Sequence, residues 1–222
     1  MANIKSLVPF GQEDVEIIST ETVYHGFYRV KKSELRHRLF EGGWSPVISR
    51  EIMDRGHAVV VLPYDPVRDT IVMLTQFRVG AVQAGGAPVR QHSNYSISPW
   101  LVELVAGMID EGESEEDVAF REMQEEAGLT PKALHFATSY LSSPGGLTER
   151  ISIYVAQVDA TQASAFGGLA EEHEDIKVTE VPRTEVIELL EAGVLDNAAT
   201  LIGIQWLMLN REKLLQDWDI ES

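Results

Sequence analysis

The sequence predicts an α/β or α+β fold, in which helices cover the faces of a mixed β-sheet. Three observations support this prediction. Short runs rich in β-branched and aromatic residues recur along the chain, and residues 57–64 form an almost continuously apolar run that suits a buried strand. Segments 184–193 and 197–218 have a helical hydrophobic period instead. The 222 residues, 44% of them hydrophobic, suffice for one large domain or for a medium and a small one.

The N-terminal region is predicted to form a small antiparallel β domain. Residues 15–55 contain short β-rich runs, with a bend expected at Gly26 and a turn at Gly42 and Gly43. Such a unit has too little apolar content to be stable alone, so it would pack against the rest of the chain or a second copy. We therefore expect a domain at residues 1–56 and a second domain at 57–222.

The second domain is expected to contain most of the sheet. Further strands are predicted over 70–79, 100–109, 133–141 and 151–158, with a turn at 65–69. Residues 80–99 have no periodicity and form a predicted loop of unusual length, which is either a functional cover or a mobile segment. The C-terminal helix is expected to pack on the sheet through Leu201, Ile204, Met208 and Leu215.

Composition excludes several classes of function. The net charge of −17 opposes binding to nucleic acid or to an anionic membrane. The chain has no cysteine, which excludes disulfides, thiolate catalysis and cysteine-bound zinc. There is no apolar run long enough to span a membrane, and the N-terminus lacks the pattern of a signal peptide. We expect a cytoplasmic protein.

A helix predicted over residues 114–128 carries an unusual concentration of acid. Ser114 suits its N-cap and Gly128 its left-handed end. Glu122, Glu125 and Glu126 lie at offsets of zero, three and four, so they share one face and repel one another. Such a face is either solvated or offered to a cation, and Mg²⁺ prefers carboxylate oxygens.

Fixed spacing around these glutamates favours the cation. Gly107 is followed by five residues and Glu113, then by seven residues and the pair Arg121–Glu122; the pattern ends with Glu125–Glu126, one residue, Gly128 and apolar Leu129. A solvated face needs no such pattern. Arg121 and Glu113 can brace the other carboxylates, and Gly107 lets the main chain approach a metal. The apolar residues Ala119, Met123 and Ala127 follow a separate flank at four-residue steps.

This pattern resembles the Nudix hydrolase family at every fixed position. The resemblance implies a mixed sheet between helices, two or more Mg²⁺ ions (Mn²⁺ being the alternative) and hydrolysis of a diphosphate. It implies metal ligation by the carbonyl of Ala106 and by Glu122 and Glu126, with Glu125 close by. Arg121 is assigned to the catalytic group as the residue that braces these carboxylates.

Segments outside the motif are similar to the bacterial ADP-ribose pyrophosphatases of that family. Examples are SPGGLTER, with Pro144 fifteen residues after Leu129, and GLAEEHEDI in a late acidic loop. In that loop the resemblance implies Glu172 as the catalytic base and Glu174 as a further metal ligand, with Glu171 and Glu174 as competing candidates for the base. A solvated acidic loop is the simpler alternative.

The same resemblance implies contacts with a nucleoside diphosphate-sugar. Phe27 matches an aromatic that stacks on adenine, and Arg50 and Arg78 match arginines near the adenosine and the diphosphate. Glu149 matches a carboxylate near the terminal ribose, which in a dimer can come from the other subunit. The alternatives are a core phenylalanine and surface ion pairs. The resemblance further implies a homodimer that exchanges its N-terminal domains.

Together these features predict Mg²⁺-dependent hydrolysis of ADP-ribose to AMP and ribose 5-phosphate. One alternative is a pyrophosphatase for another nucleoside diphosphate-sugar, such as GDP-mannose. A remote alternative is a non-catalytic ligand sensor on the same scaffold, which usually has a broken motif. The sequence departs from the pattern at residues 80–99, a longer segment than expected, and this leaves the exact specificity open.

Overall fold

The described structure covers two separate units. The computed structural model describes residues 7–84 and 98–220, so residues 85–97 of the long loop expected at 80–99 lie outside it. One unit runs through Gly56 and includes the later segment Leu141–Glu149, and the other contains His57–Tyr140 and Arg150 onward. The first unit therefore contains a segment besides the N-terminal residues 1–56.

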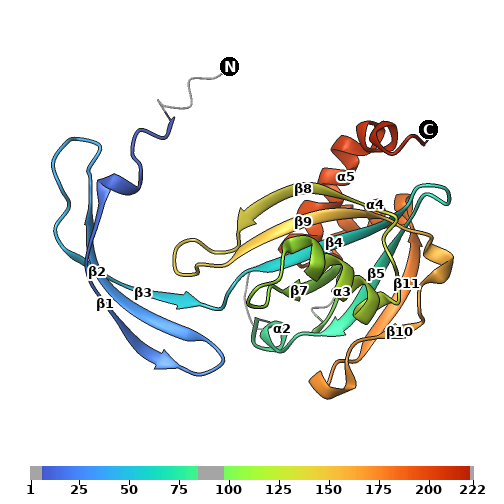
Figure 1. Ribbon diagram of the computed structural model, residues 1–222, viewed down its shortest axis with the longest axis horizontal. Helices are drawn as coiled ribbons and strands as arrows, with labels where there is room; N and C mark the ends of the chain where they lie inside the picture. The colour runs from blue at the N-terminus through green and yellow to red at the C-terminus, as the bar shows by residue number, and fades with distance from the viewer. Residues whose placement is uncertain (1–6, 85–97, 221–222) are drawn as a thin grey trace. The chain divides into compact units, whose positions relative to one another are not determined.

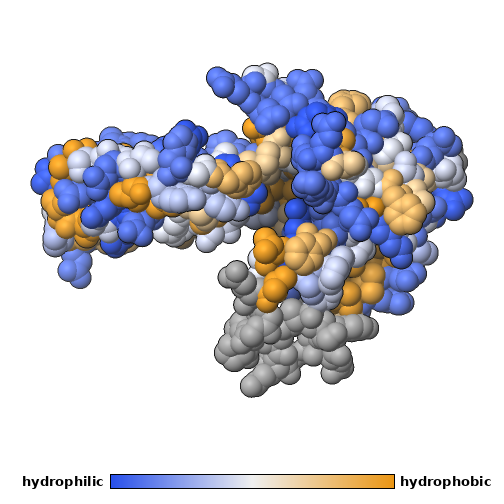
Figure 2. All heavy atoms as spheres, turned by 90° about the horizontal axis from the view of Figure 1, so that it is seen from below, coloured by the Kyte–Doolittle hydropathy of each residue, from blue (hydrophilic) through white to orange (hydrophobic). Residues whose placement is uncertain are grey.

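The first unit is a three-stranded antiparallel sheet in the order β1-β2-β3. Its strands are β1 (Val15–His25), β2 (Arg29–His37) and β3 (Ile48–Asp54), preceded by the short helix η1 (Gln12–Asp14). The bend expected at Gly26 lies between β1 and β2, where the Gly26 N–H donates to the Tyr28 carbonyl. Every residue of β1 is exposed. Figure 2 shows hydrophobic residues among hydrophilic ones on the surface of this unit, at the left of the view.

The second unit is built on a mixed sheet of eight strands (Figure 1). Six follow the order β10-β11-β5-β4-β9-β8, while β6 pairs with β5 and β7 pairs with β4. The pairing of β4 with β9 is parallel, and β4 with β7 and β5 with β11 are antiparallel. The strands are β4 (Ala58–Asp65), β5 (Thr70–Phe77), β6 (Trp100–Glu103), β7 (Val105–Met108), β8 (Ala133–Leu141), β9 (Arg150–Gln157), β10 (Phe166–Gly167) and β11 (Ile176–Pro182).

Helices lie on both faces of this sheet, with α3 on one side and α5 on the other (Figure 1). The α-helices are α2 (Val79–Ala84), α3 (Glu115–Ala127), α4 (Arg183–Glu191) and α5 (Ala198–Asp217), and the short 3₁₀ helices are η2 (Ala160–Gln162) and η3 (Ala170–Glu172). The described elements thus confirm the mixed α/β class. No helix of the described part is long and apolar enough to cross a membrane.

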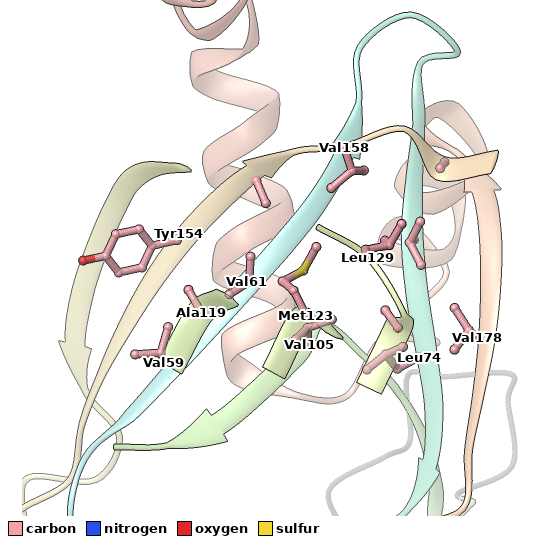
Figure 3. Close-up of a cluster of buried hydrophobic side chains, with 14 of the residues drawn as sticks. Val59, Val61, Leu74, Val105, Ala119, Met123, Leu129, Tyr154, Val158 and Val178 are labelled. Atoms are coloured by element: carbon pink, nitrogen blue, oxygen red, sulfur yellow. The ribbon is translucent and has the colours of Figure 1, made fainter. Parts of the chain in front are cut away.

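Alternation along the central strands divides the core between the two faces. On β4, Val59 and Val61 pack beneath α3, whereas Val60 and Leu62 pack beneath α5. Figure 3 shows the cluster on the α3 side, which includes Ala119 and Met123 of the helix and Leu74 and Val105 of the strands. A strand buried on both faces reads as a continuous apolar run, which explains the run at 57–64.

Several elements differ from the expectations. The strand expected over 70–79 ends at Phe77, and the helix α2 covers Val79–Ala84, where the loop 80–99 was expected to begin. The single strand expected over 100–109 is divided at Leu104, because β6 pairs with β5 while β7 pairs with β4. Met208 is 44% exposed, and Leu207 and Leu214 face the core instead. Strand β11 was not expected at all, since its sequence alternates polar and apolar residues directly after the acidic loop.

Candidate active site

Helix α3 is fixed at both ends by local interactions that its sequence predicts. The Ser114 hydroxyl accepts the Asp117 N–H, and the Asp117 carboxylate accepts the Ser114 N–H in return, which forms a capping box. Gly128 ends the helix in the left-handed conformation, with φ of 66°. At the same end Gly167 lies so close to the Glu126 carbonyl that a Cβ would collide with it. The helix is therefore held against β10 and β11.

Arg121 connects the acidic side chains of α3. Its Nε and Nη2 donate to the two oxygens of Glu113 at 2.9 and 3.0 Å. Its Nη1 donates to Glu122 at 2.6 Å and to Glu125 at 3.3 Å. Its Nη2 also donates to the Met108 carbonyl at 3.1 Å, which joins the helix to the end of β7. The guanidinium thus orients three carboxylates at once.

The glutamates are not a solvated face. Glu126 is 2% exposed, and its Oε2 accepts the Ala106 N–H at 2.9 Å. The pKa of Glu126 is raised to about 8, mainly by burial and also by the nearby charges of Glu122 and Glu174. Burial likewise raises the pKa of Glu122 to about 7, although Arg121 opposes that shift. Buried carboxylates this close together favour a bound cation or shared protons.

Gly107 provides space for this arrangement. A Cβ on Gly107 would collide with the carboxylate of Glu122. The main chain of β7 therefore passes directly beneath the helix face, next to the Ala106 N–H that Glu126 accepts. Close main-chain approach is the role that the sequence suggested for this glycine.

The late acidic loop brings one carboxylate to the helix face. Glu174 accepts the Leu169 N–H at 3.2 Å, and its charge raises the pKa of both Glu122 and Glu126. Glu171 and Glu172 lie in η3 and are exposed. Of the three loop glutamates, Glu174 is thus the one whose charge acts on the glutamates of α3.

Comparison with known proteins shows the family of the chain. The NUDIX domain family matches residues 54–201. The chain belongs to the Nudix family. An ADP-ribose pyrophosphatase of Escherichia coli (strain K12) is 50% identical over 211 residues, which cover 95% of this chain and 96% of that protein. One from Haemophilus influenzae is 44% identical over 94% of this chain and 93% of its own length.

More distant relatives share the Nudix fold. A GDP-mannose pyrophosphatase of Cronobacter sakazakii is 35% identical over 72% of this chain and 78% of that protein. The crystal structure of an ADP compounds hydrolase superposes with a TM-score of 0.65 at 21% identity, and covers 92% of this chain and 96% of that one. The fold is therefore that of a Nudix protein.

The carboxylates of α3 and of the late acidic loop together form a donor set that fits a hard divalent cation. Glu122, Glu125, Glu126 and Glu174 offer carboxylate oxygens, and Gly107 leaves room for the carboxylate of Glu122 between strand and helix. In the described residues no three His, Asp or Glu side chains are already arranged to hold a metal. The Glu122 carboxylate accepts a hydrogen bond from Arg121, and the Glu126 carboxylate accepts one from the Ala106 N–H. Binding would require these carboxylates to turn.

Arg78 lies near the Nudix glutamates, and its positive charge lowers the pKa of Glu126. Its Nε donates at 2.9 Å to Glu103, a carboxylate that is 3% exposed and also accepts a hydrogen bond from Asn197. Glu103 and Asn197 are not among the residues predicted from the sequence. A single charged residue inside the apolar run 100–109 is the signal that would have found Glu103.

The other expected substrate contacts belong to the first unit. Phe27 is 84% exposed and meets Tyr28 edge-on, so it is not a core side chain of that unit. Arg50 is exposed, and its Nη1 donates to the neighbouring Ser49 carbonyl. Glu149 is 5% exposed and forms an ion pair with Arg55 at 3.2 Å.

Proposed function

We propose that the chain hydrolyses the diphosphate of ADP-ribose to give AMP and ribose 5-phosphate. The observation that carries this proposal is the pair of mutually repelling glutamates on α3, the buried Glu126 and the half-buried Glu122, whose carboxylate occupies the room that Gly107 leaves. The choice of ADP-ribose is supported by 50% identity over nearly the whole chain to proteins named ADP-ribose pyrophosphatase.

Five residues of the second unit would hold divalent ions, with Mg²⁺ as the proposed metal. These are Glu122, Glu125, Glu126 and Glu174 through their carboxylates and Ala106 through its carbonyl. When bound, Mg²⁺ neutralises the charge of the diphosphate and lowers the pKa of bound water. The chain has a net charge of −17, so without such ions it would repel its own substrate.

The remaining residues have proposed roles in orientation and proton transfer. Arg121 keeps the carboxylates in place, and Arg78 contacts the diphosphate. Glu172 accepts a proton from the attacking water as its oxygen bonds to phosphorus and the bridging P–O bond breaks. Glu172 is exposed, which leaves its carboxylate accessible to water, and Glu171 in the same short helix is the competing candidate.

Contacts with the nucleoside are proposed for the first unit. Phe27 stacks on the adenine, Arg50 contacts the adenosine, and Glu149 lies near the terminal ribose. The high exposure of Phe27 supports its role, since an exposed aromatic face is free to stack. For Glu149 the role requires that its ion pair with Arg55 open or be shared.

A second candidate function is hydrolysis of another nucleoside diphosphate-sugar, such as GDP-mannose. The 35% identity to a GDP-mannose pyrophosphatase favours it. The non-catalytic sensor has less support, because every fixed position of the Nudix motif is present.

Initial rates with ADP-ribose and GDP-mannose test the proposal. We expect hydrolysis that requires Mg²⁺, stops with a chelator and favours ADP-ribose in kcat/KM, with AMP and ribose 5-phosphate as products. Replacing Mg²⁺ by Mn²⁺ tests the choice of metal. Preference for GDP-mannose would establish the second candidate, and the absence of any metal-dependent hydrolysis would refute both.

A further inference from the structure

The described core of the second unit contains one unexplained polar group on β5. Gln76 is 5% exposed, and its side-chain Nε2 has no hydrogen-bond acceptor among the described residues. A buried amide donor without an acceptor destabilises a folded chain, so native structures usually supply a partner. A ligand that is absent from the free protein is one such partner.

Alternation along β5 places this amide on the α3 side of the sheet. Val72 and Leu74 pack in the cluster beneath α3, and Gln76 and then Arg78 follow at two-residue steps. Figure 3 shows Leu74 on this side with Met123 of the helix. Phe77 belongs to the opposite face, where it is 50% exposed and meets Trp100 edge-on.

The strand register relates the position of Gln76 to that of Glu126 on α3. Thr75 pairs with Lys177 of β11, and Ile176, the next residue in register, pairs with Gly167 of β10. Gln76 therefore lies in one row with Ile176 and Gly167, and Gly167 is the residue that touches the Glu126 main chain. Arg78 follows Gln76 by two residues, and its positive charge lowers the pKa of the same glutamate, Glu126.

We propose that the Nε2–H of Gln76 donates to a non-bridging oxygen of the substrate diphosphate, beside Arg78. The proposal rests on the function proposed above. A neutral amide suits this place better than a further cation, because Lys or Arg would pair with Glu126 and compete with the divalent ion. The neutral amide donates to a phosphate oxygen without pairing with Glu126 or competing with the divalent ion.

Gln76→Met tests this role, because Met has nearly the shape of Gln and no polar hydrogen. We expect an unchanged or higher melting temperature, since the variant removes a buried unpaired donor. We expect KM for ADP-ribose to rise by about 10- to 100-fold, because one hydrogen bond to a charged group is lost. The value of kcat should stay nearly unchanged. Thr75→Val, a polar-to-apolar change on the opposite face, is the matched control and should change neither constant.

Calorimetric binding of ADP in the presence of Mg²⁺ separates this proposal from the proposed function. The wild type and the Thr75→Val variant should bind ADP equally, and Gln76→Met should bind it about 10- to 100-fold more weakly. That result upholds the role of Gln76 even if the wild type does not hydrolyse ADP-ribose. Equal binding by Gln76→Met, no binding by the wild type, or a lower melting temperature with unchanged KM would each overturn it.

Discussion

At the scale of single residues, Gly107 and Glu122 share one small space. The backbone of Gly107 has no positive φ, so the glycine is required for room and not for conformation. A methyl group at this position has to displace the Glu122 carboxylate, which Arg121 holds at 2.6 Å. The geometry of the carboxylates thus depends on a residue that has no side chain.

The substitution Gly107→Ala is expected to weaken the site with little effect on the fold. Displacement of Glu122 should reduce the apparent affinity for Mg²⁺ by roughly 10- to 100-fold, as for residues that orient metal ligands. Titration of the hydrolysis rate with Mg²⁺ measures this change. Gly145→Ala, at a glycine with open space and no positive φ, is the control and should leave the titration unchanged. Identical titrations for both variants would contradict the packing argument.

At the scale of elements, helix α3 is also tied to the sheet at its first turn. Glu115 accepts hydrogen bonds from Ser152 at 2.7 Å and from Tyr154 at 2.8 Å, both on β9. Tyr154 is 5% exposed, and burial together with the Glu115 carboxylate raises the pKa of its hydroxyl. The N-terminus of the helix is therefore anchored independently of the carboxylates that face Arg121.

Removal of this anchor is expected to lower stability more than catalysis. Tyr154→Phe deletes a hydrogen bond to a charged group, which should cost about 1.5–3 kcal/mol of unfolding free energy. KM and kcat should stay close to those of the wild type, because Ser152 still holds Glu115. Chemical denaturation measures the unfolding free energy. Tyr24→Phe, at an exposed tyrosine, is the control. A variant as stable as the wild type would show that the anchor contributes nothing.

Elements with strong local signals were predictable from the sequence. The capping residue Ser114 and the terminal Gly128 predicted the ends of α3, and the run 133–141 predicted β8 over the same residues. Elements whose bounds depend on the strands that they pair with were not predictable from the sequence. The break at Leu104 depends on which strand pairs with each half, and β11 has a short alternating sequence that is only recognisable beside β5.

The residues of the site likewise fall into those that could be predicted from the sequence and those that could not. The glutamates of α3 could be predicted because their spacing on one helix is fixed by the sequence. Glu103 is conspicuous in the sequence as a single charge in an apolar run, but its partners Arg78 and Asn197 could not be predicted, because they come from other elements. The burial of Gln76 could not be predicted either, since it depends on the strands and the helix packed around β5. Burial, which raises the pKa of Glu126, is likewise a property of the folded sheet and helix.

At the scale of the whole molecule, the first unit has an incomplete interior. All eleven residues of β1 are exposed, among them Ile17 at 66%, Ile18 at 49% and Val23 at 49%. Apolar patches of this kind commonly mark a protein interface. We propose that a second copy of the chain covers this sheet, in a homodimer that exchanges its N-terminal domains.

Sedimentation at micromolar concentration tests the dimer. A species of twice the chain mass of 24.7 kDa is expected. Ile17→Asp, which places a charge on the exposed face of β1, should shift the population toward the monomer because burying an unpaired charge is unfavourable. Glu21→Gln, at another exposed position of the same strand, is the control. A wild type that sediments as a monomer would refute the proposal.

The central claim is that the buried carboxylates of α3 perform metal-dependent hydrolysis, and Glu126→Gln tests it most directly. Burial raises the pKa of Glu126, so the folded state favours the neutral form, and the neutral glutamine should fold at least as stably without metal. With Mg²⁺, we expect kcat/KM for ADP-ribose to fall by at least about 100-fold. Glu111→Gln, an equal change of charge at an exposed position, should hydrolyse at the wild-type rate. Undiminished hydrolysis by Glu126→Gln would contradict the account.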